Sequence, residues 1–249
     1  MIPILNDGWC KGWLTMPGRL SIYDDKAFKN DVIQSLGSFK DEVQNLVPNY
    51  NTAPTIAIPI LTNTRRYTTA HFGLIPSWAK ERSQMQINAR SESVFEKVTF
   101  KEAYRARRCL LLVNGYYEWL KGSGGAKSVP YFISSKTGDY FAFAGLYEEW
   151  YDNALGQTIL SCALLTTEPN EFIEPIHDRM PVILAKESWK TWLDPKSDYR
   201  TLNKLYTPYP SHEMQMHTVS NEVNSVKNNG IECIKEASIE VPTQRSLFD

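Results

Sequence analysis

The sequence predicts a single α+β domain, built on a mostly antiparallel sheet that curls toward a barrel. Three observations predict it. Apolar and aromatic runs of strand length dominate the chain after residue 108, helical periodicity is confined to short segments, and neither a linker nor an internal repeat divides the 249 residues. Strands gathered in this way, with a few helices beside them, are typical of an α+β arrangement around one core.

The helical segments are short. Residues 24–46 carry apolar residues at helical spacing interrupted by Gly37, which predicts one or two short helices. In residues 93–108, Phe100, Ala103 and Tyr104 share a helical face, and the arginines that follow suit a helix C-terminus. A short helix is also expected over 168–176, with Pro169 near its start.

The strands follow from β-branched and aromatic runs between turn residues. The residues from 48 to 61 predict a loop that leads into a strand, and those from 67 a strand ended by Ile75-Pro76. Further strands are expected over 109–121, 130–135, 140–151 and 158–167. After them come a strand running into a helix over 181–193 and a last strand with a loop over 214–226.

Composition limits the possible functions. Hydrophobic residues make up 42% and charged residues 22%, as in ordinary globular proteins, and the net charge of -1 confines any nucleic-acid surface to a local patch. No apolar run is long enough to cross a bilayer and the first fifteen residues make a poor signal peptide, so the cytoplasm is expected. The scattered cysteines and histidines predict neither metal site nor disulfide framework, and no cofactor is expected; Cys109 and Cys162 are expected to be buried in strands.

The stretch INARSES, residues 87–93, is the first of four polar segments that interrupt apolar patterns. It contains Asn88 and Arg90, which could act at a site. Helix capping by Asn88 or Ser91, with Glu92 or Glu96 nearby, explains it equally well.

The second segment is the aromatic run VNGYYEW, which is interrupted by the carboxylate of Glu118. A carboxylate buried among aromatic rings has a raised pKa, which suits a general acid or base. Strand alternation could instead point it to water, and from the local sequence alone that alternative is favoured.

The third segment is PIHDRMPVIL, which contains His177, Asp178 and Arg179. A histidine there can transfer protons near neutral pH, although a lone histidine more often packs or caps. The fourth stretch, VSNEVNSV at 219–226, could close a polar loop around a site, and ordinary loop hydrogen bonding explains it equally simply.

Together these stretches resemble the SOS response-associated peptidase family, also described as abasic-site processing proteins. The resemblance runs from about residue 16 to about residue 236. It rests on six segments in order: RYTTAHFGLIPSWAKE, INARSESV, RRCLLLVNGYYEW, FAFAGLYEEW, LLTTEPNEFIEPIHDRMPVIL and VSNEVNSVKNNG. It implies a domain at 16–237, an N-terminal extension at 1–15 and a C-terminal tail at 238–249.

The resemblance implies action on abasic sites in single-stranded DNA. Family members begin Met-Cys-Gly-Arg, lose the methionine, and use the cysteine amine and thiol to trap the sugar aldehyde as a thiazolidine. The corresponding residues here are Met16-Pro17-Gly18-Arg19, so Pro17 stands at the nucleophile position. Cys10 is internal, has no free amine, and cannot replace it. Two alternatives therefore stay open: a DNA-binding module that has lost its nucleophile, and a peptidase.

The family's site residues carry over by motif. The resemblance implies that Asn88 orients the linkage, that Glu118 moves protons, and that His177 acts on the sugar oxygen. It also assigns phosphate contacts to Arg90, Arg179 and Arg19. Base stacking is assigned to Trp78, with Leu74, Ile75 and Pro76 beside it, and to Phe72, which replaces a family tryptophan.

The tail ends in QRSLF, which resembles the bacterial sliding-clamp-binding pentapeptide apart from Arg245. Leu247 and Phe248 would fill an apolar cleft of the clamp while Gln244 bonds at its rim, as in short-peptide docking. The alternative is that these residues fold back onto the domain. A monomer associated with the nucleoid is the expected state.

Overall fold

The computed structural model describes residues 17–122, 127–137 and 139–238. Within them the largest sheet contains a closed ring of five strands: β4 (Ala57–Thr62), β5 (Arg66–Phe72), β7 (Arg108–Val113), β10 (Phe141–Asp152) and β11 (Gln157–Thr167). Neighbouring strands pair antiparallel except at the closure, where β11 runs parallel to β5 and Cys162 lies opposite Phe72. The predicted curled, mostly antiparallel sheet is therefore confirmed.

Three short strands extend this ring. They are β6 (Asn88–Arg90), parallel to β11; β12 (Met180–Pro181), antiparallel to β11; and β2 (Lys40–Asp41), parallel to β5. Because β6 and β12 both pair with the last residues of β11, segments far apart in the sequence meet there. This meeting point carries part of the candidate site.

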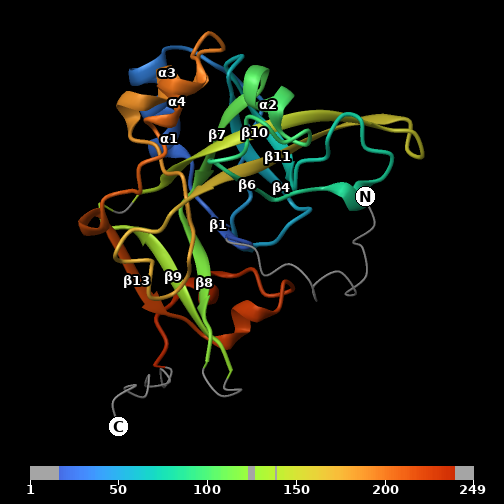
Figure 1. Ribbon diagram of the computed structural model, residues 1–249. Helices are drawn as coiled ribbons and strands as arrows, with labels where there is room; N and C mark the ends of the chain where they lie inside the picture. Colours follow the sequence, from blue (N-terminus) through green and yellow to red (C-terminus); the bar gives the residue numbers. More distant parts are fainter. Residues whose placement is uncertain (1–16, 123–126, 138, 239–249) are drawn as a thin grey trace.

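A second, antiparallel sheet leaves the barrel on one side, and Figure 1 shows its strands below the barrel. Its order is β13 (Met214–Thr218), β9 (Val129–Ser135), β8 (Gly115–Leu120), β1 (Leu20–Ile22) and β3 (Asn49–Thr52). Figure 1 places helices α1 (Lys26–Leu36), α3 (Trp189–Leu193) and α4 (Tyr199–Asn203) together at the opposite end of the molecule.

The remaining helical elements are short. They are α2 (Lys101–Ala106) and the 3-10 turns η2 (Arg82–Gln84), η4 (Lys186–Ser188), η5 (Ser211–Glu213), η6 (Asn221–Asn224) and η7 (Ile231–Ile234). Within the described residues, no helix is long and apolar enough to cross a membrane.

The unbroken apolar run of β7 is explained by burial of both its faces. Leu110 and Leu112 pack in the cluster that includes the helical residues Phe28 and Trp189, whereas Leu111 belongs to the cluster on the other face. A strand covered on both sides reads as continuous rather than alternating hydrophobicity. The prediction that Cys109 and Cys162 are buried in strands is also confirmed.

The expected strand 109–121 is two strands, because Asn114 interrupts it. Its side-chain oxygen accepts hydrogen bonds from the N–H groups of Tyr23 (2.7 Å) and Asp24 (3.1 Å), and its amide donates to the carbonyls of Asp24 and Asp139, both at 2.9 Å. An asparagine that bonds backbone groups in this way ends a strand and redirects the chain. The chain thereby passes from the barrel into the second sheet.

The prediction of one or two short helices over 24–46 is confirmed by α1, which ends before Gly37, whereas two other helix predictions are wrong in part. Residues 38–46 form no helix, because Lys40–Asp41 pairs with β5. Residues 93–100 form turns before α2 begins. Residues 168–176 form turns, in which the Asn170 side chain accepts hydrogen bonds from the N–H groups of Phe172 (3.1 Å) and Ile173 (3.0 Å). Local hydrogen bonds of asparagine compete with helix formation.

Candidate functional site

Glu118 is buried in the middle of β8, with only 4% of its surface exposed. Its Oε1 atom has no hydrogen-bond partner among the described residues. Burial raises the pKa of this carboxyl well above its usual value. The alternative in which strand alternation points Glu118 to water is therefore wrong, and burial favours the neutral form of this carboxyl.

The segment that contains Pro17 runs beside Glu118. Leu20 of β1 lies opposite Tyr116 of β8, and the Tyr117 N–H donates to the Arg19 carbonyl at 3.1 Å. Gly18 and Pro17 precede Arg19, so the chain enters this pairing from the side of β8 that contains Glu118. Pro17 is buried.

Asn88 and Arg90 lie on one face of β6, because side chains alternate along a strand. Ala89 between them is fully buried in the core, while Asn88 is half-buried and Arg90 is exposed. Asn88 pairs with Leu164 and Arg90 with Thr166 of β11. The helix-capping alternative is wrong for Asn88, since it belongs to a strand, and the capping role also fails for Ser91, which precedes turns.

His177 follows the turns that replace the expected helix, and its own N–H donates to the Ile173 carbonyl at 3.0 Å. Its Nδ1 atom lies 2.7 Å from Asp178 Oδ1 and 3.2 Å from the backbone nitrogen of Arg179. Burial lowers the pKa of the imidazole, Asp178 opposes that effect and Lys121 adds to it. The ring is therefore neutral above its lowered pKa and able to donate or accept one proton.

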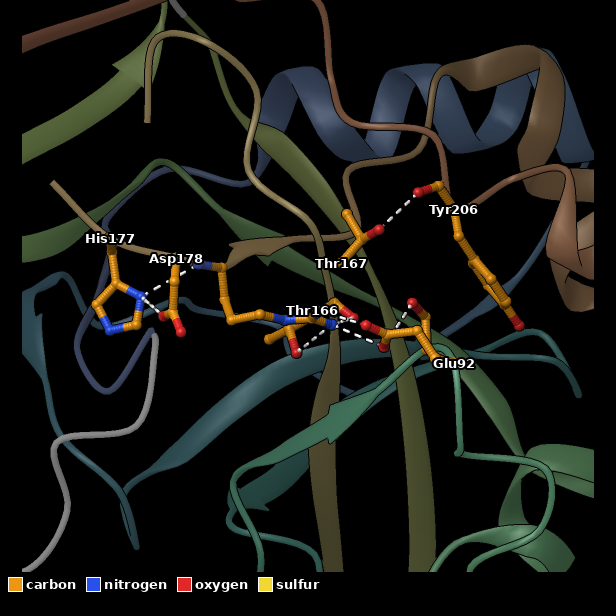
Figure 2. A network of polar contacts seen from close by, with 8 residues as sticks. Glu92, Thr166, Thr167, His177, Asp178 and Tyr206 are labelled. Carbon is orange, nitrogen blue, oxygen red and sulfur yellow. Dashed lines mark hydrogen bonds and ion pairs between the residues drawn. The ribbon is translucent and has the colours of Figure 1, made fainter. Parts of the chain in front are cut away.

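Arg179 is held by an ion pair. Both guanidinium Nη atoms donate to the Glu92 carboxylate, and Nη2 also donates to the Thr166 carbonyl at 2.6 Å. Figure 2 shows this network, with His177 and Glu92 at its opposite ends and Thr166 between them. Only 13% of the Arg179 side chain is exposed. A phosphate can therefore reach this guanidinium only by displacing Glu92.

The segments with Asn88 and His177 meet at the end of β11. Thr166 pairs with Arg90 on one side, and its carbonyl accepts from Arg179 on the other. Lys121, which follows β8, lowers the pKa of His177 through its positive charge. The structure thus brings the segments of Asn88 and His177 together at the end of β11.

Trp78 is the exposed aromatic of this part of the chain, at 53% exposure. Its loop is fixed from both sides: the Ile75 N–H donates to Ser161 Oγ at 2.9 Å, and the Trp150 indole donates to the Ala79 carbonyl at 2.6 Å. A rigid, exposed indole provides a surface on which a base can stack.

The prediction that Phe72 stacks on a base is wrong. Its ring is 0% exposed and packs in the barrel cluster with Ile60 and Leu111, so it offers no stacking surface. Leu74, Ile75 and Pro76 are likewise buried. The stacking role was inferred from the tryptophan that family members have at this position. In this chain the position is part of β5 and its side chain points into the core.

Arg19 anchors a loop. Its Nη1 donates to Asn51 Oδ1 (2.7 Å) and to the Val223 carbonyl (2.8 Å), and its guanidinium lies 5.8 Å from the centre of the Trp119 ring. The Trp119 indole in turn donates to Asn224 Oδ1 at 2.7 Å. The stretch 219–226 is thus tied to β8 beside Glu118.

The partners that organise Arg179 are not apparent from the sequence. Glu92 is 87 residues away in the chain, and the contact with Thr166 depends on the pairing of β12 with β11. Among the described residues, no group of three or more histidine, cysteine, aspartate or glutamate side chains is arranged to hold a metal ion. Cys10, Gln244, Leu247 and Phe248 lie outside the described residues.

Comparisons with known proteins match this chain along most of its length. The model of the family described as SOS response associated peptidase (SRAP) matches residues 16–226. Abasic site processing protein YoaM of Bacillus subtilis is 40% identical over 230 residues, which cover 88% of this chain and 97% of its own. Abasic site processing protein HMCES of Rattus norvegicus is 29% identical over 234 residues, 77% of this chain and 66% of its own.

Among solved structures, a crystal structure of a protein from Bacteroides thetaiotaomicron superposes with a TM-score of 0.77 at 26% identity. The match covers 88% of this chain and 99% of that one. The barrel with its attached second sheet is therefore an architecture that this chain has in common with a solved protein.

Proposed function

The chain belongs to the SOS response associated peptidase family, and from this premise we propose that it processes abasic sites in single-stranded DNA. One observation of the site supports the proposal: Glu118, whose pKa burial raises, is buried on the strand that pairs with the segment following Pro17. Imine formation between an amine and an aldehyde needs such a proton donor, because water must leave the carbinolamine.

We assign the roles that the family resemblance implies. Glu118 donates the proton that releases water. Asn88 orients the sugar through its amide, and His177 donates to or accepts from the ring oxygen. Arg90, which is exposed on the same face of β6 as Asn88, contacts a flanking phosphate, and Trp78 stacks on a base beside the lesion.

The reactive form is a chain whose first residue is Pro17. In the 249-residue chain the Pro17 nitrogen is part of a peptide bond and cannot attack an aldehyde. An N-terminal amine titrates near pH 8, so a useful fraction is neutral at about pH 7. Such an amine would condense to a cationic iminium, which promotes β-elimination at the sugar and cuts the strand.

Arg90→Ala is expected to weaken binding to single-stranded DNA and to reduce the slope of log affinity against log salt by about 0.7, the contribution of one phosphate contact. Fluorescence anisotropy across a salt series measures it. Arg105→Ala is the matched control, because Arg105 is 82% exposed on α2, which packs against the barrel away from the second sheet. A slope unchanged from wild type would remove Arg90 from the phosphate contacts.

Denaturing electrophoresis after mixing with abasic single-stranded DNA separates the proposed function from a binding module that has lost its nucleophile, and affinity separates recognition of the lesion from general binding of single strands. The proposed function predicts that an abasic oligonucleotide binds more tightly than the same strand with every base present, because Asn88 and His177 contact the exposed sugar. Anisotropy with the two strands and with duplex DNA compares them. Equal affinity for both single strands would favour a general single-stranded DNA-binding module that has lost the family reaction.

We also propose that the chain is a monomer of the cytoplasm, associated with the nucleoid through its DNA and through the sliding clamp. The support for the clamp is the QRSLF sequence, with Gln244, Leu247 and Phe248 as its anchors. Purified clamp should retain the 249-residue chain and not a chain ending at residue 243. Equal retention of both would contradict the clamp contact.

A further inference from the structure

One residue, Arg179, connects His177 to Glu92 by its two ends. At one end its backbone N–H donates to Nδ1 of His177 at 3.2 Å. At the other its guanidinium donates to both oxygens of Glu92 and to the Thr166 carbonyl. Figure 2 shows the chain of contacts from His177 to Glu92.

The Nδ1 atom of His177 has two competing partners. A hydrogen bond from the Arg179 N–H requires a lone pair on Nδ1, so the ring must be neutral with its proton on Nε2. A hydrogen bond to Asp178 Oδ1, which lies 2.7 Å away, requires a proton on Nδ1. The two bonds exclude each other, and the position of the Arg179 backbone therefore influences which form of the ring is favoured.

The Arg179 side chain is fixed firmly enough to hold that backbone. The planar guanidinium matches a carboxylate with two parallel hydrogen bonds, which restrict its orientation more than a single contact does. Its 13% exposure and its bond to Thr166 restrict it further. Partial burial would raise the pKa of Glu92, but the hydrogen bonds from Arg179 hold it below its usual value, so the partner remains a carboxylate.

We propose that Glu92 is a positioning residue for His177: by fixing Arg179, it keeps the Arg179 N–H on Nδ1 of the neutral ring and leaves the ring proton on Nε2. In that form the outward nitrogen is a donor, as required of a group that protonates the sugar oxygen. Only the protonation of the sugar oxygen rests on the proposed function, because the protein without DNA already has this arrangement of the ring.

Removal of Glu92 has two opposite effects on the His177 pKa. Loss of a negative charge, with Arg179 left unpaired, lowers it by electrostatics. Loss of the hydrogen bond that stabilises the neutral ring raises it. The charged groups that act on the ring from its surroundings, Asp178 and Lys121, remain in both cases. The sign of the change therefore separates positioning from a simple charge effect.

The test is an NMR titration of the histidine ring signals in the 249-residue chain, with His177→Gln to assign the signal. Glu92→Ala is expected to raise the His177 pKa by about half a unit to one unit, the value of one hydrogen bond. The ¹⁵N shifts of the neutral ring should move from one tautomer toward a mixture. Glu92→Gln, which keeps the shape, should change both in the same direction.

Glu96→Gln is the matched control, since Glu96 is an exposed carboxylate four residues further along the same segment. His71 and His217, which bond to the carbonyls of Thr55 and Ile234, serve as internal references. A His177 pKa in both Glu92 variants that equals or lies below that of Glu96→Gln would overturn the proposal.

A second measurement separates this proposal from the proposed function. In the chain that begins at residue 17, the pH profile of any covalent step on abasic DNA should move with the His177 pKa in Glu92→Gln. If neither the shortened parent chain nor its variants react with abasic DNA but the NMR shift is observed, the positioning role stands and the proposed function fails. If the variants react and the NMR signal does not shift, the positioning role fails alone.

Discussion

A chain that begins at residue 17 and carries Pro17→Cys is expected to form a cross-link with abasic single-stranded DNA that survives denaturing electrophoresis without borohydride. The N-terminal amine condenses with the sugar aldehyde and water leaves. The thiolate then adds to the imine carbon and closes a thiazolidine, which consumes no further reactant. Proline cannot complete the second step, because it has no thiol.

The control is the 249-residue chain with the same substitution, shown by intact mass to be uncleaved. Its residue 17 is inside a peptide bond, so no cross-link is expected. Absence of a cross-link with the folded, shortened Pro17→Cys chain would mean that the site beside Glu118 does not hold an abasic sugar, and the proposed function would be wrong.

Glu118→Gln in the shortened Pro17→Cys chain is expected to slow cross-linking on the order of 10²-fold, because glutamine keeps the shape of the protonated acid and cannot transfer its proton. Affinity for abasic DNA should be almost unchanged, since Glu118 is buried. Single-turnover gel assays give the rate, and anisotropy gives the affinity. An unchanged rate would exclude Glu118 from proton transfer.

Protein stability provides the control for this variant. The pKa of Glu118 is raised in the folded protein, so its contribution to stability is present at low pH and is lost as pH rises through the folded-state value. Glutamine remains neutral at every pH. Thermal unfolding at alkaline pH should therefore find Glu118→Gln at least as stable as the parent, and a slow reaction cannot be attributed to unfolding.

The strands were predictable because their apolar runs are long, and burial of both faces of β7 only strengthened the pattern. The end of the strand at Asn114 was not predictable, because it depends on hydrogen bonds with the backbone of Tyr23, Asp24 and Asp139, which are distant in sequence. The burial of Glu118 was likewise not predictable from the local sequence. Alternation alone allowed it to face water, and the second sheet decides its burial.

The site residues were predictable in identity and only partly in role. Arg179 carries a charge that suits phosphate, but its partner Glu92 is 87 residues away and converts it into an anchor. Phe72 was assigned to stacking by motif, whereas its place in β5 turns it inward. In both cases a contact across the fold, which no local pattern records, sets what the side chain does.

The most direct test of abasic-site processing is borohydride trapping with the chain that begins at Pro17. Borohydride reduces an iminium to a stable amine, so a covalent species on a denaturing gel reports the condensation itself. The account predicts a trapped adduct and slow strand cleavage with abasic single-stranded DNA, and neither with a strand in which every base is present. If Pro17 gives no trapped adduct while its Pro17→Cys counterpart cross-links well, Pro17 is an inactive replacement and the natural chain is a binding module.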